Sequence, residues 1–123
     1  MFMHAGGPAH AHFFHGITTM NLNHAHLLVL FTYPNNGYSD DGHIHRYQGI
    51  TRYKQGHFHR FEGLTGPAIA LPGGSHLHRI DNQVDEEPFR LQGGYYTTVS
   101  SIPRHRHRYG GMTGIPIGYD PSF

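Results

Sequence analysis

Six histidine pairs of the form His-x-His are the residues of this sequence with the clearest chemical potential. The pairs hold twelve of the 14 histidines, and they are His10 and His12, His24 and His26, His43 and His45, His57 and His59, His76 and His78, and His105 and His107. Neutral imidazole is a common ligand of transition metals. In a β-strand, residues two apart share a face, so each pair presents two ring nitrogens to one point. Two pairs on neighbouring strands supply four nitrogens, which predicts three four-histidine metal sites within the chain or between subunits.

The number of pairs decides between metal binding and a simpler interpretation. A single pair is more simply explained as two half-buried polar residues bonded to the backbone or a tyrosine. Six pairs would need many dedicated hydrogen-bond partners, which favours metal. Zinc or copper is the first expectation, with nickel or iron as alternatives. His4 and His15, outside the pairs, are expected to be ordinary histidines.

Four of the pairs begin a longer motif in which an aromatic residue, a glycine and a threonine follow at fixed offsets. The four copies span residues 10–18, 43–51, 57–65 and 105–113. In a strand, the aromatic residue and the glycine fall on the same face as the histidines, while arginine falls on the opposite face in three of the copies. The pairs at His24 and His76 keep only an apolar residue at the aromatic's offset. We therefore predict strands with histidines inward and arginines toward water.

The spacing of the pairs indicates an internal repeat. The intervals between the first five pairs alternate between 14 and 19 residues, which implies a unit of 33 residues. We expect an N-terminal arm at 1–9, a single β domain at 10–118 and a C-terminal tail at 119–123. Within the domain the repeats are 10–42, 43–75 and a diverged copy at 76–118.

Composition supports a fold made of short strands. The chain has 17 glycines and 8 prolines in 123 residues, and no convincing helical stripe. We predict an all-β fold, an antiparallel sandwich or barrel built from histidine-pair hairpins, with few or no helices. The segment 66–71 is expected to be short and buried. The sequence has no cysteine, so disulfide bonds cannot cross-link such a fold. Metal ions bound by histidines from different strands could stabilise it instead.

Several classes of partner are disfavoured. The formal net charge is +1, and the basic stretch Arg104 to Tyr109 places its arginines on an outer face, so nucleic acid is not expected as a partner. The acidic residues follow no EF-hand spacing. The longest apolar run, Leu27 to Phe31, is far too short to span a membrane. The first residues lack the basic and apolar regions of a recognisable signal peptide.

The central third of the chain resembles a known family. His-x-His-Arg-Phe-x-Gly-x-Thr-Gly-Pro-Ala-Ile, at residues 57–69, is followed by Pro-Gly-Gly-Ser-His-x-His at 72–78. These motifs resemble the YmaF-like family of His-x-His repeat proteins from spore-forming and related bacteria. The resemblance covers residues 43–80 well and the outer thirds through the repeated pair alone. It implies a bacterial origin and the histidine repeat, with no established activity, and leaves residues 85–101 unassigned.

Three functions fit these observations. The first is a structural, self-assembling protein, such as a filament, coat or appendage subunit, stabilised by metal-binding pairs and found at the cell or spore surface or outside the cell. Its support is that an enzyme needs one site, whereas a scaffold benefits from many. The second is a cupin-like β-barrel metalloenzyme, with Glu62 after His59 as the carboxylate ligand, although Gln48 stands at that place after His45. The third is a soluble metal store.

Overall fold

The structure is a computed structural model that describes residues 8–118. Residues 1–7, with His4 and most of the expected arm, and the expected tail lie outside the described residues. The described strands are β1 (Ala9–Ile17), β2 (Leu27–Phe31), β3 (Asn35–Asn36), β4 (Arg46–Ile50), β5 (Arg60–Leu64), β6 (Ile69–Ala70), β7 (His76–Leu77), β8 (Arg79–Gln83), β9 (Phe89–Gln92), β10 (Tyr95–Thr98), β11 (Arg108–Met112) and β12 (Pro116–Ile117). Every described element is a strand, which confirms the all-β prediction. Residues 8–118 contain no helix long and apolar enough to cross a membrane.

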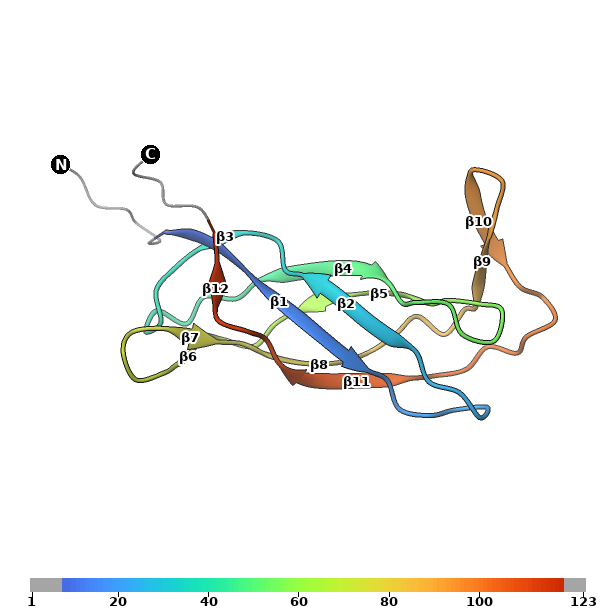
Figure 1. The fold of residues 1–123 in the computed structure, drawn as a ribbon, viewed down its shortest axis with the longest axis horizontal. Helices are drawn as coiled ribbons and strands as arrows, with labels where there is room; N and C mark the ends of the chain where they lie inside the picture. Colours follow the sequence, from blue (N-terminus) through green and yellow to red (C-terminus); the bar gives the residue numbers. More distant parts are fainter. Residues whose placement is uncertain (1–7, 119–123) are drawn as a thin grey trace.

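Three long antiparallel hairpins form the body of the molecule (Figure 1). They pair β1 with β2, β4 with β5, and β8 with β11. The register places Phe14 opposite Leu30 and Tyr47 opposite Gly63. Each 33-residue unit or its diverged copy therefore contributes one hairpin.

Backbone hydrogen bonds join neighbouring hairpins near both of their ends. The bonds run from the amide of Tyr33 to the carbonyl of Arg46 and from Arg52 to Leu27, from Gly66 to Arg79 and Asp85 to Arg60, and from Gly114 to Phe13 and Thr19 to Arg108. Their donor to acceptor distances are 2.7–2.9 Å. Because each hairpin is bonded to both of the others, the three hairpins surround one interior.

The apolar core lies in the middle of this interior. Its members come from all three hairpins, and they are Phe14, Leu28, Leu30, Tyr47, Phe61, Ile80, Val84 and Tyr109. The hydroxyls of Tyr47 and Tyr109 lie 3.0 Å apart and hydrogen bond to each other. A Cβ atom at Gly63 would lie 2.6 Å from the Tyr47 hydroxyl, so the motif's glycine makes room for an aromatic ring across the hairpin.

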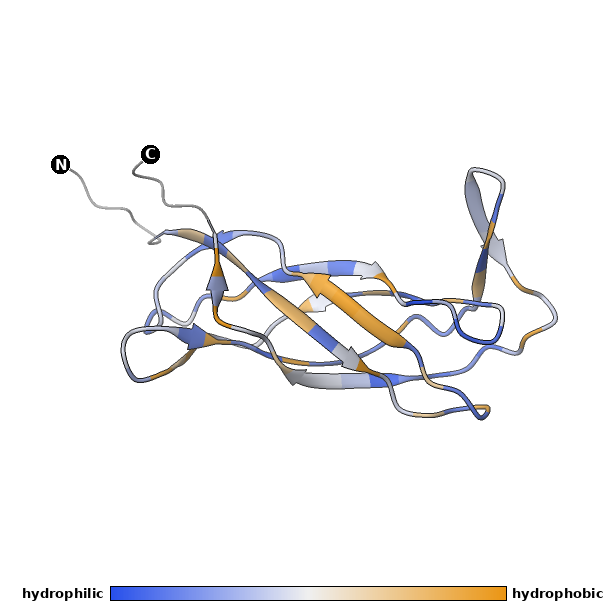
Figure 2. Ribbon diagram, viewed as in Figure 1, coloured by the Kyte–Doolittle hydropathy of each residue, from blue (hydrophilic) through white to orange (hydrophobic). Residues whose placement is uncertain are grey.

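The outer faces of the three hairpins differ in polarity. Figure 2 shows β2 as hydrophobic along its length, and its outward side chains Leu27, Val29 and Phe31 are exposed. Ile17, which pairs with Leu27, is exposed beside them. The outer faces of the β4–β5 and β8–β11 hairpins instead carry arginine and carboxylate side chains, as the sequence pattern predicts.

Residues 85–104 form an insertion between the two strands of the third hairpin, and they cover the side chain of Phe58. β9 and β10 pair with each other, and Phe89 forms an isolated bridge with Phe58. The rings of Phe89 and Tyr96 pack on Phe58, which is fully buried although its position belongs to an outer face. The insertion therefore adds a second, small aromatic cluster outside the main hairpins.

The prediction of a buried segment at 66–71 is wrong, because none of its residues is buried. β6 pairs with β7 alone, and Ile69 is 43% exposed. The reason is that this short hairpin extends to the end of the molecule, where no other described strand packs over its apolar side chains (Figure 1).

Candidate metal centres

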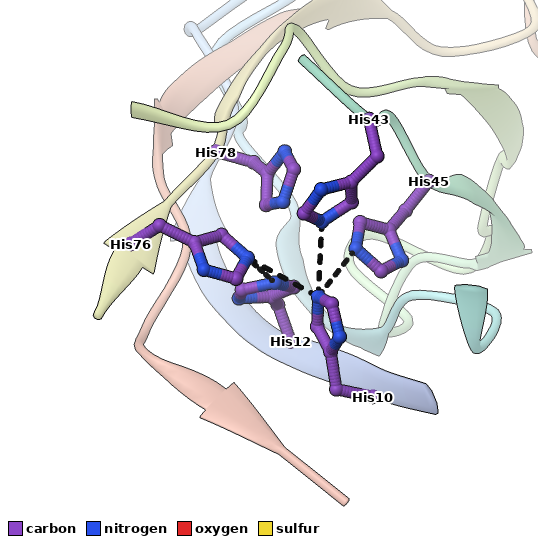
Figure 3. A group of neighbouring side chains, drawn as sticks. All are labelled: His10, His12, His43, His45, His76 and His78. Carbon is purple, nitrogen blue, oxygen red and sulfur yellow. Dashed lines mark hydrogen bonds between the residues drawn. The ribbon is translucent and has the colours of Figure 1, made fainter. Parts of the chain in front are cut away.

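The histidine pairs gather into two clusters, each with one pair from each hairpin. Cluster A consists of His10, His12, His43, His45, His76 and His78, and cluster B of His24, His26, His57, His59, His105 and His107. Figure 3 shows the six rings of cluster A turned toward a common centre. Eleven of the twelve residues are buried, and the side chain of His43 is only 6% exposed. The inward orientation predicted for the pairs is confirmed, and His15 is exposed on the outer face as expected.

The grouping differs from the three four-histidine sites expected from the sequence. The expectation assumed that the histidine pairs of two neighbouring strands lie side by side and share one site. In each hairpin, however, the strands are antiparallel, so the pair of one strand lies opposite the far end of the other. The amide of His12, for example, bonds to Thr32, and the amide of His26 bonds to Thr18. Alternate pairs along the chain therefore share a cluster, and all of them meet within one chain.

The rings of each cluster are arranged like the corners of an octahedron. In cluster A, rings in contact have centroids 4.4–5.1 Å apart and stand edge to face. Each ring contacts every other ring of its cluster except one. The exceptions pair up as His10 with His78, His12 with His43, and His45 with His76, and in Figure 3 these rings lie across the centre from each other. Three mutually crossed opposite pairs define an octahedron.

Cluster B repeats this arrangement. Its contacting rings have centroids 4.7–5.1 Å apart. The rings that do not contact each other are His24 and His59, His26 and His105, and His57 and His107. The two clusters are thus two copies of one geometry, built by the same repeat at its two ends.

The Nε2 atoms point to the centre of each cluster. In cluster A the Nε2 atom of His10 lies 3.0 Å from that of His43, 3.1 Å from His76 and 3.2 Å from His45. In cluster B the Nε2 atom of His24 lies 3.1 Å from that of His105 and 3.2 Å from that of His107. The ligand nitrogens of cluster A all lie within 4.8 Å of one another, as do those of cluster B apart from His107.

The Nδ1 atom of the second histidine in every pair is held by the neighbouring hairpin. Each donates to a backbone carbonyl at 2.8–2.9 Å, from His12 to Gly114, His26 to Arg52, His45 to Tyr33, His59 to Asp85, His78 to Gly66 and His107 to Thr19. Such a bond from the distal ring nitrogen is the usual support of a metal-bound histidine. The contacts between hairpins and the orientation of the rings therefore depend on each other.

The first histidine of most pairs is held by the chain just before it. Nδ1 donates to the carbonyl two residues earlier in four cases, from His10 to Pro8, His24 to Leu22, His57 to Gln55 and His105 to Pro103, at 2.8–3.2 Å. His43 differs, because its Nδ1 atom lies 2.7 Å from the carboxylate of Asp41.

These bonds determine which ring nitrogen carries the proton. A carbonyl oxygen only accepts, so Nδ1 must be the N–H, and a neutral imidazole then has a bare lone pair on Nε2. Two such lone pairs 3.0–3.2 Å apart are not hydrogen bonded and repel each other unless a cation lies between them. The Nε2 atom of His78 is buried and has no hydrogen-bond partner among the described residues. The donor set therefore fits a metal cation, and the clusters are able to hold one.

Burial keeps the rings neutral, as metal binding requires. The pKa of His12 and of His59 is lowered to about 3, chiefly by desolvation and also by neighbouring imidazoles, while the backbone hydrogen bonds act in the opposite direction. The same causes lower the pKa of His26, His45 and His76 to about 4, with no backbone bond acting on His76. At neutral pH these rings are uncharged and their lone pairs are available.

The threonine of the repeat closes the end of each hairpin. The Thr32 hydroxyl accepts the amide of His12, and Thr65 does the same for His45, at 2.9 and 3.1 Å. Thr18, Thr51 and Thr113 repeat this contact with His26, His59 and His78. Thr32 was not predicted to belong to the repeat, although it follows His24 at the same eight-residue offset as the other threonines. The sixth pair differs, because the residue eight positions after His76 is Val84, which has no hydroxyl.

Glu62, a candidate metal ligand, and the arginines of the basic stretch lie outside the clusters. Glu62 is exposed on the outer face of β5, where it pairs with Gln48, and it contributes to neither cluster. Its expected place as a ligand beside His59 is therefore not supported by the structure, because its position in the strand faces away from the histidines. Arg104, Arg106 and Arg108 are exposed and form ion pairs with Glu87, Glu86 and Asp81.

Comparisons with known proteins identify similar sequences. The family model described as "YmaF: Spore germination protein GerY/YamF" matches residues 32–88. The uncharacterized protein YmaF of Bacillus subtilis (strain 168) is 41% identical over 120 residues, which cover 93% of this chain and 88% of that protein. No solved structure matches the chain.

Proposed function

This chain belongs to the YmaF family, and we propose that it is a structural protein that metal ions in clusters A and B hold together and that assembles with copies of itself. One observation carries the metal part of the proposal. Twelve inward rings surround two buried centres, and in eleven of them the Nδ1 hydrogen bond leaves Nε2 bare. Zinc, copper, nickel and iron all accept imidazole ligands.

The position of the clusters favours a structural role for the metal. Each cluster draws on all three hairpins, so an ion at its centre would link segments that are far apart in the sequence. Such links stabilise a folded chain most when it has a small core and no disulfides. The described core has eight members, and the sequence has no cysteine.

The outer face of the β1–β2 hairpin supports self-assembly. Ile17, Leu27, Val29 and Phe31 form an apolar surface on the two strands, with exposed fractions of 62, 52, 44 and 59%. The exposed His15, which pairs with Val29, is the polar residue among them. The other hairpins are different, because Arg60 pairs with Asp85 and Arg108 with Asp81 within the chain. A two-fold interface between copies brings the same patch of each copy together, which this largely apolar surface permits because it carries no lysine, arginine, aspartate or glutamate.

The family description suggests where such an assembly functions. It names the family for spore germination, and we propose that this chain acts in the spore, as a coat or appendage subunit or a filament.

Metal analysis and light scattering test the proposal together. Protein purified without added metal should contain transition metal at up to two ions per chain, and removal with a strong chelator should lower its thermal stability. Light scattering should show species larger than the monomer. A chain that contains no metal, takes none up and unfolds identically with and without chelator would refute the metal role, and a monomer at all concentrations would refute assembly.

The alternatives receive less support. A cupin-like metalloenzyme needs an open coordination position and, in this chain, Glu62 as a ligand, but Glu62 faces away from the clusters. A metal store needs sites that exchange readily, whereas these rings are buried.

A further inference from the structure

We infer that each cluster binds one divalent ion through all six Nε2 atoms, in an octahedral shell that favours nickel(II), cobalt(II) or iron(II) over zinc or copper. This inference rests on the proposed metal-binding role and specifies the coordination and the class of ion. It concerns clusters A and B equally, because they share one arrangement.

The distances between neighbouring nitrogens indicate coordination number six. Around an ion with metal to nitrogen bonds of about 2.1 Å, adjacent ligands lie about 3.0 Å apart in an octahedron and about 3.4 Å apart in a tetrahedron. The Nε2 separations in cluster A are 3.0, 3.1 and 3.2 Å around His10. Those in cluster B are 3.1 and 3.2 Å around His24. Three further separations, from His12 to His76, His26 to His57 and His59 to His105, are each 3.2 Å. The separations therefore run from close to the octahedral value to midway between the two, and none reaches the tetrahedral value.

The identity of the opposite rings supports the same conclusion. In a tetrahedral site every ligand is adjacent to every other. In each cluster, by contrast, each ring has one opposite partner that it does not contact, such as His10 and His78. The two histidines of one pair are always adjacent, and opposite rings always come from different hairpins. The three hairpins thus supply one edge each of the same octahedron.

A switch to four ligands would be costly in this interior. Two rings would have to leave the ion, and their Nε2 atoms would remain buried without a partner. The second histidine of each pair is also fixed through Nδ1 to a carbonyl of a neighbouring hairpin, so a ring that turns away breaks that bond too. The protein therefore presents the six-coordinate arrangement to any ion that enters.

This arrangement selects among ions. Zinc in structural sites is almost always four-coordinate and tetrahedral, and copper(II) prefers tetragonal sites with long axial bonds. Magnesium and calcium prefer oxygen ligands. Nickel(II), cobalt(II) and iron(II) accept both imidazole and a regular octahedron, so they match the ligand type and the geometry together.

Cobalt(II) is the probe that tests this inference directly. Metal-free full-length protein is titrated with cobalt(II), and its visible absorption is recorded. We expect saturation at two ions per chain, with the weak bands of six-coordinate cobalt. X-ray absorption of the nickel(II) form should show about six nitrogens at about 2.2 Å. Competition between nickel(II) and zinc should favour nickel by more than their affinities for an unstructured histidine peptide.

Variants separate the two clusters. His78→Ala removes one ligand of cluster A, and His107→Ala one of cluster B, so each should change the spectrum of one bound cobalt and leave the other unchanged. His15→Ala, on the exposed face, is the matched control for metal binding and should bind two cobalt ions with the spectrum of the unmodified chain. If a variant does not fold, the titration and X-ray absorption of the unmodified chain still decide the question.

The outcomes distinguish this inference from the proposed function. Intense tetrahedral cobalt bands, or four nitrogens at about 2.0 Å, would overturn the octahedral assignment while leaving a metal-stabilised structural role intact. Failure to bind any transition metal would overturn both.

Discussion

The Nε2 atoms of His10 and His43 lie 3.0 Å apart, although each ring already donates its Nδ1 proton elsewhere. The acceptors are the carbonyl of Pro8 and the carboxylate of Asp41. Two neutral rings in this state face each other with lone pairs and gain nothing from being close. A cation between them turns the contact into coordination, and the same relationship recurs around both clusters.

Removal of one ligand should weaken one site and the fold together. We expect His12→Ala to weaken the binding of the ion in cluster A, to leave that of cluster B unchanged, and to lower the free energy of unfolding by several kcal/mol, since metal binding is folding free energy. Urea denaturation and metal content measure the two effects. His15→Ala should change the free energy of unfolding by less than about 0.5 kcal/mol. Binding of two ions per chain by His12→Ala with the affinity of the unmodified chain would contradict the assignment.

Metal-free protein should lose stability as the pH falls. The folded-state pKa values of about 3 for His12 and His59 and about 4 for His26 and His45 lie below the unfolded value of 6.5. Between these limits the unfolded chain binds protons that the folded chain does not, so stability is complete above pH 6.5 and declines below it. Each such histidine contributes a slope of up to about 1.4 kcal/mol per pH unit.

Urea denaturation of the metal-free protein between pH 5 and 8 measures this decline. The metal-loaded protein should show a steeper loss, because protons also displace the ion. A free energy of unfolding that stays constant from pH 8 to pH 5 would mean that the rings are protonated equally in the folded and unfolded chains.

The threonine contacts offer a substitution in both directions. Thr65→Val removes the hydroxyl that accepts the His45 amide and should cost about 1 kcal/mol of unfolding free energy. Val84→Thr introduces a hydroxyl that could accept the amide of His107, as the threonines do at the other five positions. We expect this change to leave the free energy of unfolding unchanged or to raise it. Thermal unfolding compares the two. Equal destabilisation by both changes would show that side-chain volume, and not the hydrogen bond, governs this position.

Glycine at the centre of the hairpins should not tolerate a larger residue. A Cβ atom at Gly63 would lie 2.6 Å from both the Asn82 amide nitrogen and the Tyr47 hydroxyl, so we expect Gly63→Ala to cost about 1–3 kcal/mol. Gly66→Ala is the control, because the nearest atom to its Cβ would be 3.7 Å away. Denaturant unfolding distinguishes them, and equal stability of the two variants would contradict the packing described.

A charge on the apolar face should prevent assembly. We expect Val29→Lys to shift the protein toward the monomer without unfolding it, since the introduced ammonium would have to be buried in the interface. Glu62→Lys, at an exposed outer position of the β4–β5 hairpin, is the matched control and should not change the oligomeric state. Light scattering over a range of concentrations compares the two variants, and an unchanged assembly in Val29→Lys would exclude this face as the interface.

Local chemistry alone determined much of this protein. A period of two places His57, His59, Phe61 and Gly63 on one face of a strand, so the inward histidines, the all-β fold and the hairpin repeat follow from the order of the residues. Those are short-range properties, because each depends on neighbours within one strand or one turn.

Only the tertiary structure decided which histidines meet. Antiparallel pairing sends the two pairs of each hairpin to opposite ends, so His12 and His26 never share a centre, whereas His12, His45 and His78 do. The number of ligands at each centre depends on how many hairpins pack around one interior, and that is set by contacts between residues dozens of positions apart. Six nitrogens instead of four, and with them the choice of metal, are therefore consequences of packing.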